Sequence, residues 1–184
     1  MATMIVKGRE VLVDDDNFAF LSKYNWNIKR TPSGKCYIRT RMCGKPVDMH
    51  TAVMASTDEV DHKNGNTFDN RRDNLRPSTH SQNMRNSGKK RGAWTSRFKG
   101  VSRIKDRSSV WEARIATNGR RKNLGRFPCE ITAAACYDLA ARAIHKEFAS
   151  GNFTDDELRE LKSEILEPAI ARCVKHGIAA TIKY

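Results

Sequence analysis

Long apolar stretches are missing from this chain of 184 residues. Because no run of about 18 apolar residues occurs, the sequence predicts no membrane-spanning helix. The first residues, MATMIVKGREVLVDDD, also lack the apolar core of a secretory signal peptide. We therefore expect an intracellular, cytoplasmic protein.

The chain has no Cys-x-x-Cys motif of the kind that binds zinc or cycles between thiol and disulfide. Its cysteines are odd in number and widely spaced, which favours free thiols over disulfides or a zinc site. They are Cys36, Cys43, Cys129, Cys136 and Cys173.

Acidic residues are scarce relative to basic ones. Lys and Arg number 34 against 21 Asp and Glu, which gives a formal net charge of +13. A surplus of this size in a short chain favours a polyanionic partner, with nucleic acid as the first candidate. An anionic membrane surface is the second, but no long basic amphipathic helix supports it.

Two blocks of the sequence are typical of short strands. Residues 4–55 hold short apolar and β-branched stretches, broken at SGK and CGK, which suit hairpin turns. Within this block NFAFLSKYNWNI fits a short helix or a strand, and periodicity does not decide between them. Residues 97–127 alternate in the same way, with a hairpin turn expected at Asn118-Gly119.

Helical patterns dominate the C-terminal part. ITAAACYDLAARAIHKEF is rich in Ala and places Ala135, Leu139, Ala143 and Ile144 on one helical face. The residues TDDE at 154–157 predict a capping box at the start of another helix. Pro168 is expected to interrupt or end that helix.

The stretch VDHKNGNTFDNRRDNLRPSTHSQN, residues 60–83, is too polar to build a core. A strand, a loop and a helix in this order can bring Asp61 and Asn83 together. One carboxylate and one carboxamide oxygen suit a hard divalent cation. His62 could accept a proton from a water that attacks phosphorus, because its pKa is near neutrality. Taken singly, these residues would more often be surface or turn residues.

The same stretch resembles the HNH homing endonucleases of phages and introns, which share the ββα-metal fold. The likeness is carried by DHKNGNTFDNRRDNLR and the Asn of HSQN, and it covers residues 45–86. It implies that Asp61 and Asn83 hold a metal ion, Mg²⁺ or Mn²⁺, and that His62 is the general base. It also implies that Asn74 braces the loop and that the host cell is bacterial or phage-infected.

Two further histidines are accessory candidates. His50 lies where related sequences carry an upstream strand histidine, but the family often has His-Arg where this chain has His50-Thr51. A basic phosphate contact is then missing at that position. His80, one helical turn before Asn83, is either a further ligand or a solvated helix residue.

Residues 98–153 resemble the Apetala-type (ethylene-response-factor) DNA-binding domain. The resemblance implies a three-stranded antiparallel sheet packed on one helix, and such a ribbon fits the major groove. Ser102 and Asn123 stand where the family uses Arg and Trp for base contacts, so the preferred DNA sequence should differ. The matching positions are Gly100-Val101, Trp111, Ile115, Leu124-Gly125, Phe127, Tyr137-Asp138, Ala140-Ala141 and Asn152-Phe153.

Ten cations are candidates for contact with DNA. Arg suits paired hydrogen bonds to guanine, whereas Lys more often meets phosphate. The alternatives are a solvated sheet face and a solvated tether, and Trp111 is assigned to packing. The candidates are Lys99, Arg103, Arg114, Arg120 and Arg121 in the sheet region, with Arg85, Lys89, Lys90, Arg91 and Arg97 in or near the linker.

These patterns predict an α+β fold: a small N-terminal antiparallel sheet leading into a ββα-metal motif, then a three-stranded antiparallel sheet packed on one helix. The expected parts are a nuclease domain at 1–85, a basic linker at 86–96, a DNA-binding domain at 97–153 and a helical extension at 154–184.

The predicted function is that of a metal-dependent, site-selective DNA endonuclease of the homing type, acting on double-stranded DNA and not at a membrane. The alternative is a sequence-specific DNA-binding regulator whose HNH segment is only a scaffold, and an RNA-binding protein is a weaker third. The sequence leaves monomer and homodimer open, and with them nicking or double-strand cleavage.

Overall fold

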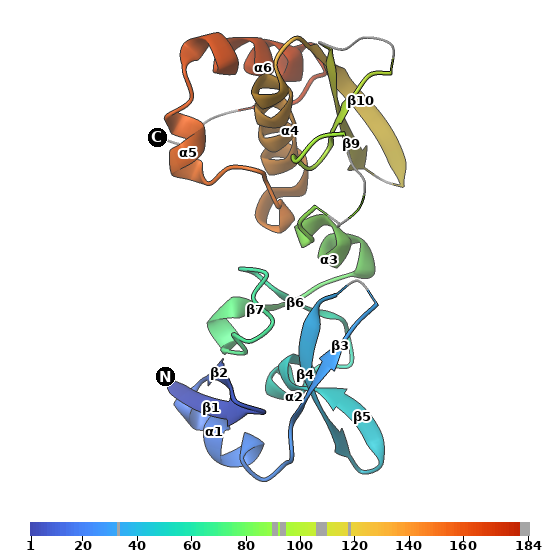
Figure 1. The fold of residues 1–184 in the computed structure, drawn as a ribbon. Helices are drawn as coiled ribbons and strands as arrows, with labels where there is room; N and C mark the ends of the chain where they lie inside the picture. The colour runs from blue at the N-terminus through green and yellow to red at the C-terminus, as the bar shows by residue number, and fades with distance from the viewer. Residues whose placement is uncertain (33, 90–91, 93–94, 106–109, 118, 181–184) are drawn as a thin grey trace. The chain divides into compact units, whose positions relative to one another are not determined.

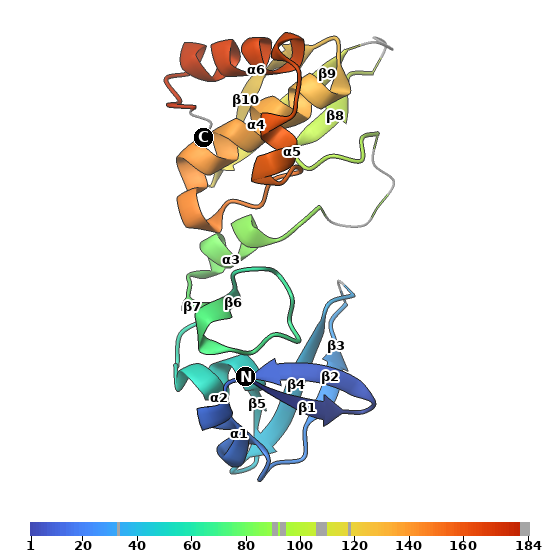
Figure 2. The same ribbon diagram turned by 90° about the vertical axis from the view of Figure 1, so that its left-hand side faces the viewer.

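The structure is a computed structural model that describes residues 1–32, 34–89, 92, 95–105, 110–117 and 119–180. The chain forms two compact units, Met1–Asn86 and Ser87–Tyr184, each with its own hydrophobic core (Figures 1 and 2). In the described part of the chain, no helix is both long enough and apolar enough to cross a bilayer. Four residues singled out above lie outside the described residues: Ser33, Lys90, Arg91 and Asn118.

The first unit begins with a hairpin of β1 (Ala2–Val6) and β2 (Arg9–Val13). Its two-residue turn, Lys7-Gly8, has positive φ at both positions, 50° and 76°. Such turns match the twist of the flanking strands, and glycine adopts this conformation without strain.

A second, three-stranded antiparallel sheet follows in the order β3-β4-β5. The turn between its last two strands is Cys43-Gly44, again with positive φ at both residues (49° and 78°), so the hairpin expected at CGK is confirmed. The strands are β3 (Asn27–Arg30), β4 (Cys36–Met42) and β5 (Lys45–Asp48).

Helices replace part of the strand pattern predicted for residues 4–55. The undecided segment contains both elements, because α1 (Asp15–Leu21) ends before β3 begins. Residues expected to continue the strands instead form α2 (Met49–Met54). The reason is a four-residue spacing: Met49 and Val53 fall on one helical face and are both buried in the core.

The strands β6 (Val60–His62) and β7 (Leu75–Pro77) pair antiparallel, and α3 (His80–Asn86) follows them. This is the ββα arrangement expected from the sequence. Between the strands, the loop at 63–74 is tied to β2, because Leu12 N donates to Phe68 O (2.8 Å) and Asn70 N donates to Leu12 O (2.8 Å). The N-terminal hairpin therefore supports the loop that follows Asp61 and His62.

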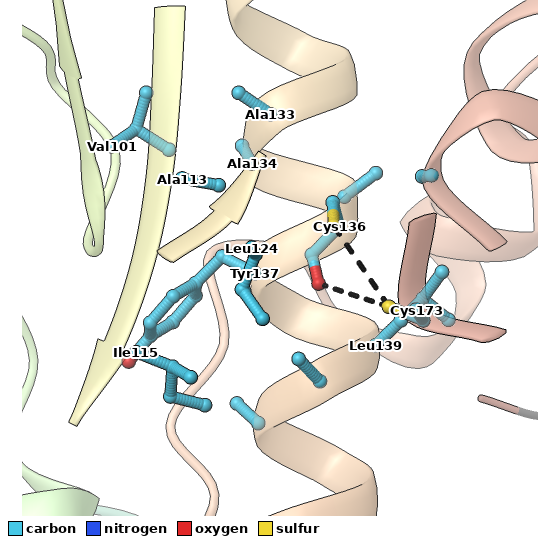
Figure 3. Close-up of a cluster of buried hydrophobic side chains, with 14 of the residues drawn as sticks. Val101, Ala113, Ile115, Leu124, Ala133, Ala134, Cys136, Tyr137, Leu139 and Cys173 are labelled. Atoms are coloured by element: carbon cyan, nitrogen blue, oxygen red, sulfur yellow. Dashed lines mark hydrogen bonds between the residues drawn. The ribbon is translucent and has the colours of Figure 1, made fainter. Parts of the chain in front are cut away.

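The second unit contains a three-stranded antiparallel sheet in the order β10-β9-β8, packed on the long helix α4. Sheet residues such as Val101 and Ile115 pack on the same cluster as Ala133, Ala134 and Tyr137 of the helix (Figure 3). The elements are β8 (Val101–Arg103), β9 (Trp111–Thr117), β10 (Arg120–Phe127) and α4 (Glu130–His145). The α+β fold class is thus confirmed.

Two more helices, α5 (Asp155–Arg159) and α6 (Ser163–Lys175), belong to the same unit. The capping box is confirmed, since Glu157 N donates to Thr154 Oγ1 and Thr154 N donates to the Glu157 side chain. The expectation for Pro168 is wrong, because the capped helix already ends at Arg159 and the proline lies inside α6.

Helix α6 covers the side of α4 that faces away from the sheet. Cys173 of α6 lies against Cys136 of α4, with 3.8 Å between the sulfur atoms (Figure 3). Because α4 is enclosed on both sides, every residue from Thr132 to Ala141 is buried rather than a single apolar stripe. The small Ala side chains allow this double packing.

Candidate functional site

Asp61 lies on β6 directly opposite Arg76 of β7. The guanidinium donates from Nε (3.1 Å) and Nη2 (2.8 Å) to Asp61 Oδ2. The side chains of Arg76 and Asp61 are only 9% and 6% exposed. A buried carboxylate needs such a partner, because leaving water is costly for an unpaired charge. The pair therefore fixes the position of the Asp61 carboxylate.

Asn86, the last residue of α3, reaches the same carboxylate. Its Nδ2 lies 3.1 Å from Asp61 Oδ1, 2.9 Å from Asp61 Oδ2 and 2.8 Å from the backbone oxygen of His62. These contacts join the C-terminal end of the helix to β6. The strand and the helix that flank the polar loop thus meet at Asp61.

His62 follows Asp61 on the strand and is only 4% exposed. Its Nε2 lies 3.2 Å from Asn70 Oδ1. Since Asn70 Nδ2 donates to Thr67 O (3.3 Å), Asn70 Oδ1 is the atom that accepts the Nε2 hydrogen of His62. The lone pair of the imidazole is then on Nδ1. Burial lowers the pKa of His62, although Asn70 and Asp61 act in the opposite direction, so the ring is neutral at neutral pH.

His50 of α2 packs edge-on against His62, with 5.0 Å between the ring centroids. Tyr37 of β4 lies beside both rings, at 5.7 Å from His50 and 6.4 Å from His62. Burial, and next the neighbouring His62, lower the pKa of His50 to about 4. Two neutral imidazoles and a phenol thus share one cluster next to Asp61.

Asn74 connects both ends of the loop between β6 and β7. Its Oδ1 accepts from Asn64 N (3.0 Å) and its Nδ2 donates to Asp69 O (2.8 Å). Asp69 is itself held by Arg71, whose Nε and Nη2 each lie 2.7 Å from a carboxylate oxygen. Side-chain hydrogen bonds therefore hold the loop where it follows the strand of Asp61 and His62.

The other two candidates lie on α3. Asn83 is half-buried, and its backbone N donates to Thr79 O at 2.9 Å. His80 is exposed and pairs with Glu59, with 3.2 Å between Nδ1 and Oε1. Among the residues that the structure describes, no three His, Cys, Asp or Glu side chains form a cluster suited to a metal ion. Any cation here would depend on carboxamide and carbonyl oxygens beside Asp61.

In the second unit, the sheet face opposite α4 carries cations; we call it the outer face. Ala113 and Ile115 of β9 point into the core, so the alternating Glu112 and Arg114 point outward. Glu112 accepts from Asn123 Nδ2 (2.6 Å) and forms ion pairs with Arg114 and Arg126, the latter at 3.9 Å. This acid is only 4% exposed because its partners cover it.

The remaining cation candidates differ in their surroundings. Arg121 pairs in register with Ala116, which places it on the outer face, and it is exposed. Arg103 and Arg120 are exposed at strand ends, and the Arg103 guanidinium lies 5.7 Å from the half-buried Trp111 ring, which packs on the core. Arg97 is exposed, with its guanidinium 4.8 Å from the Phe98 ring.

Two of the lysines predicted to contact DNA donate hydrogen bonds to backbone oxygens of the protein itself. Lys89 Nζ donates to Phe98 O (2.5 Å), and burial lowers its pKa. Lys99 Nζ donates to Ser87 O (2.6 Å) and Ser150 O (3.3 Å). Arg85 is half-buried in the last turn of α3. The two lysines thus have a structural role that their charge alone did not indicate.

Several residues at these sites were not singled out from the sequence. Arg76 could have been found from the register of a hairpin that pairs His62 with Leu75. The outward orientation of Arg126 could not be predicted from simple alternation. The bulge between Asn123 and Gly125 shifts the alternation of β10 by one residue. The residues not singled out include Tyr37, Asn70, Arg71, Arg76, Asn86, Glu112 and Arg126.

Comparison with known proteins identifies one segment. Residues 56–85 match the family model of HNH endonucleases. No curated protein matches the chain. The matched segment contains Asp61, His62, Asn74 and Asn83, and it ends just before Asn86. The match supports an HNH nuclease domain and a DNA-cleaving function of the nuclease type.

Proposed function

We propose that the chain is a metal-dependent, site-selective DNA endonuclease of the homing type. The observation that carries the proposal is the placement of Asp61 and His62, side by side on β6 within the matched segment, with the Asp61 carboxylate held against α3 by Asn86. A carboxylate next to a neutral imidazole supplies both a cation ligand and a base.

In this proposal His62 is the general base. Its lowered pKa keeps the imidazole neutral, and Asn70 directs the lone pair to Nδ1. A neutral ring with a fixed tautomer can take a proton from an attacking water without first losing one. Asn74 positions His62 indirectly, by holding the loop between β6 and β7.

Asp61 and Asn83 are the proposed holders of a divalent cation, Mg²⁺ or Mn²⁺. The chemistry of the donors fits, because a carboxylate and carboxamides offer the oxygen atoms that hard cations prefer. When bound, the cation would offset negative charge on the phosphate and the leaving oxygen. Arg76 of the neighbouring strand holds the Asp61 carboxylate in place.

The second unit is the proposed DNA-binding part. The proposal is supported by the arginines on the outer face, Arg114, Arg121 and Arg126. They lie on a three-stranded antiparallel sheet, the kind of sheet that Apetala-type domains use to bind DNA. Arg side chains on a β-ribbon can reach guanine edges in the major groove, and exposed cations add affinity that depends on salt. Tethering this reader to the nuclease raises the local concentration of target DNA.

A DNA-binding regulator without nuclease activity is the second candidate. The observation in its favour is the near-complete burial of His62, which is 4% exposed. A base in this position has to become accessible to the scissile phosphate when DNA binds.

Plasmid cleavage separates the two functions. With Mg²⁺ or Mn²⁺ the parent protein should nick or linearise plasmid. The substitution His62→Ala should lower the cleavage rate by about 10²–10⁴-fold. Ser81→Ala is the control, since Ser81 is exposed on α3 and has no predicted role in the site. If gel shifts detect DNA binding but no metal gives cleavage, the regulator is the better description. Competition by duplex RNA tests the remaining RNA-binding alternative.

A further inference from the structure

Three oxygen atoms converge on the carboxamide nitrogen of Asn86. Asp61 Oδ1, Asp61 Oδ2 and the backbone oxygen of His62 all lie between 2.8 and 3.1 Å from Nδ2. The NH₂ group has only two hydrogens for these three acceptors. A partly positive group therefore occupies a position surrounded by a carboxylate and a carbonyl, which are the ligand types of a hard cation.

The charge balance at Asp61 explains why a carboxamide would matter. The guanidinium of Arg76 already compensates the single negative charge of Asp61. The affinity of a site for a divalent cation depends on the number and charge of its oxygen ligands. Because Arg76 offsets the charge of Asp61, the net charge of the pair contributes little to that affinity. Neutral oxygen donors close to Asp61 must then supply much of the attraction.

Helix α3 can provide two such donors. Asn83 and Asn86 are three residues apart, so their side chains share one face of the helix. Asn83 is the position that the HNH resemblance assigns to the metal, whereas Asn86 lies outside the matched segment. The printed contacts nevertheless connect Asn86, directly, to the Asp61 carboxylate.

We propose that Asn86 is an additional residue of the divalent-cation site. Without a cation, its Nδ2 bridges Asp61 and the carbonyl of His62; when a cation binds, the carboxamide turns about its Cβ–Cγ bond and presents Oδ1 instead. The two ends of a carboxamide have nearly the same shape, so the exchange needs little space. The inference rests on the proposed function, because it requires a cation at Asp61.

The test measures Mn²⁺ binding to the full chain without DNA, by electron paramagnetic resonance, so that activity is not needed. Asn86→Ala should weaken binding by about tenfold or more, the size seen when groups around a metal site are removed. Asn86→Asp should bind at least as tightly as the parent, because it keeps an oxygen donor and adds a charge. Ser81→Ala, an exposed change on the same helix, should not differ from the parent.

Each outcome bears on a different statement. If Asn86→Ala binds Mn²⁺ as tightly as the parent or more tightly, while Asp61→Ala loses binding, Asn86 is no ligand and the metal site at Asp61 stands without it. If Asp61→Ala binds like the parent, or the parent binds no Mn²⁺, the cation site itself is wrong. Circular dichroism controls for folding, and recovery of binding by Asn86→Asp excludes a purely structural effect of the Ala variant.

Discussion

At the scale of single residues, Asp61 and His62 are neighbours in sequence whose side chains meet different surroundings. Asp61 faces a guanidinium and a carboxamide, whereas His62 faces Asn70 and a second imidazole. Alternation along β6 sends successive side chains to opposite sides of the strand. The two residues remain linked through Asn86, whose Nδ2 contacts both the Asp61 carboxylate and the backbone oxygen of His62.

Replacing Asn70 by Ala should lower kcat by at least about tenfold, because fixing the tautomer of a catalytic histidine is worth up to about 10⁴ in rate. Asn70→Asp should retain more activity, since its carboxylate still accepts from Nε2–H of His62. Single-turnover cleavage at saturating DNA measures the effect. Equal rates for Asn70→Ala and the parent would remove Asn70 from the site.

Replacing Arg76 by Ala should reduce the free energy of unfolding by about 3–5 kcal/mol, because it leaves the buried Asp61 carboxylate without its guanidinium partner. Urea denaturation measures the loss. Adding Asp61→Asn to this variant should recover part of the stability, since the uncompensated charge is then gone. A larger loss in the double variant would show that the charge pair is not the cause.

At the scale of elements, the bulge in β10 decides which cations the outer face presents. It places Arg126 outward together with Arg114, around the covered carboxylate of Glu112. An acid held among arginines restricts their side chains, and ordered side chains lose less entropy when they bind. The sheet thus combines ion-paired arginines around Glu112 with Arg121 farther along β10.

Arg121→Ala should weaken DNA binding and reduce the slope of log K against log salt by about 0.9, the value for one lost phosphate contact. Fluorescence anisotropy over a range of salt concentrations measures both. Lys175→Ala is the matched control, because this exposed cation lies on α6 and not on the sheet. The same slope for Arg121→Ala and the parent would exclude a phosphate contact at this position.

At the scale of the whole molecule, the two units have separate cores and should unfold separately. The division between the two units falls between Asn86 and Ser87. It lies one residue after the boundary expected between the nuclease domain and the linker. Helices α5 and α6, which lie in the helical extension expected as a separate part at 154–184, contribute Leu158, Ala169 and Cys173 to the core that contains α4.

The first unit should lose stability in acid through Asp69. Hydrogen bonds from Arg71 hold the pKa of Asp69 below its ordinary value of 3.8. The folded state therefore favours the ionised carboxylate, and the resulting stability is complete above pH 4 and lost as the pH falls below that value. Asp69→Asn should flatten this pH dependence in the unfolding transition of the first unit. The unfolding transition of the second unit should stay unchanged. Calorimetry between pH 3 and 7 tests it, and an unchanged acid slope would contradict the assignment to Asp69.

The sequence by itself determined the α+β class, the turn at CGK, the capping box at Thr154 and the polar segment that matches the HNH family. These features depend on neighbouring residues, so local pattern is sufficient to predict them. It also determined the choice of Asp61 and His62 as the residues to test.

Only the tertiary structure decided which side chains surround them. The pairing of Arg76 with Asp61 depends on strand register, the reach of Asn86 depends on where α3 ends, and the outward turn of Arg126 depends on a bulge. Helix α2 and the burial of α4 on two sides likewise follow from packing between distant segments. Such contacts are set by the free energy of the whole fold, which no short stretch of sequence contains.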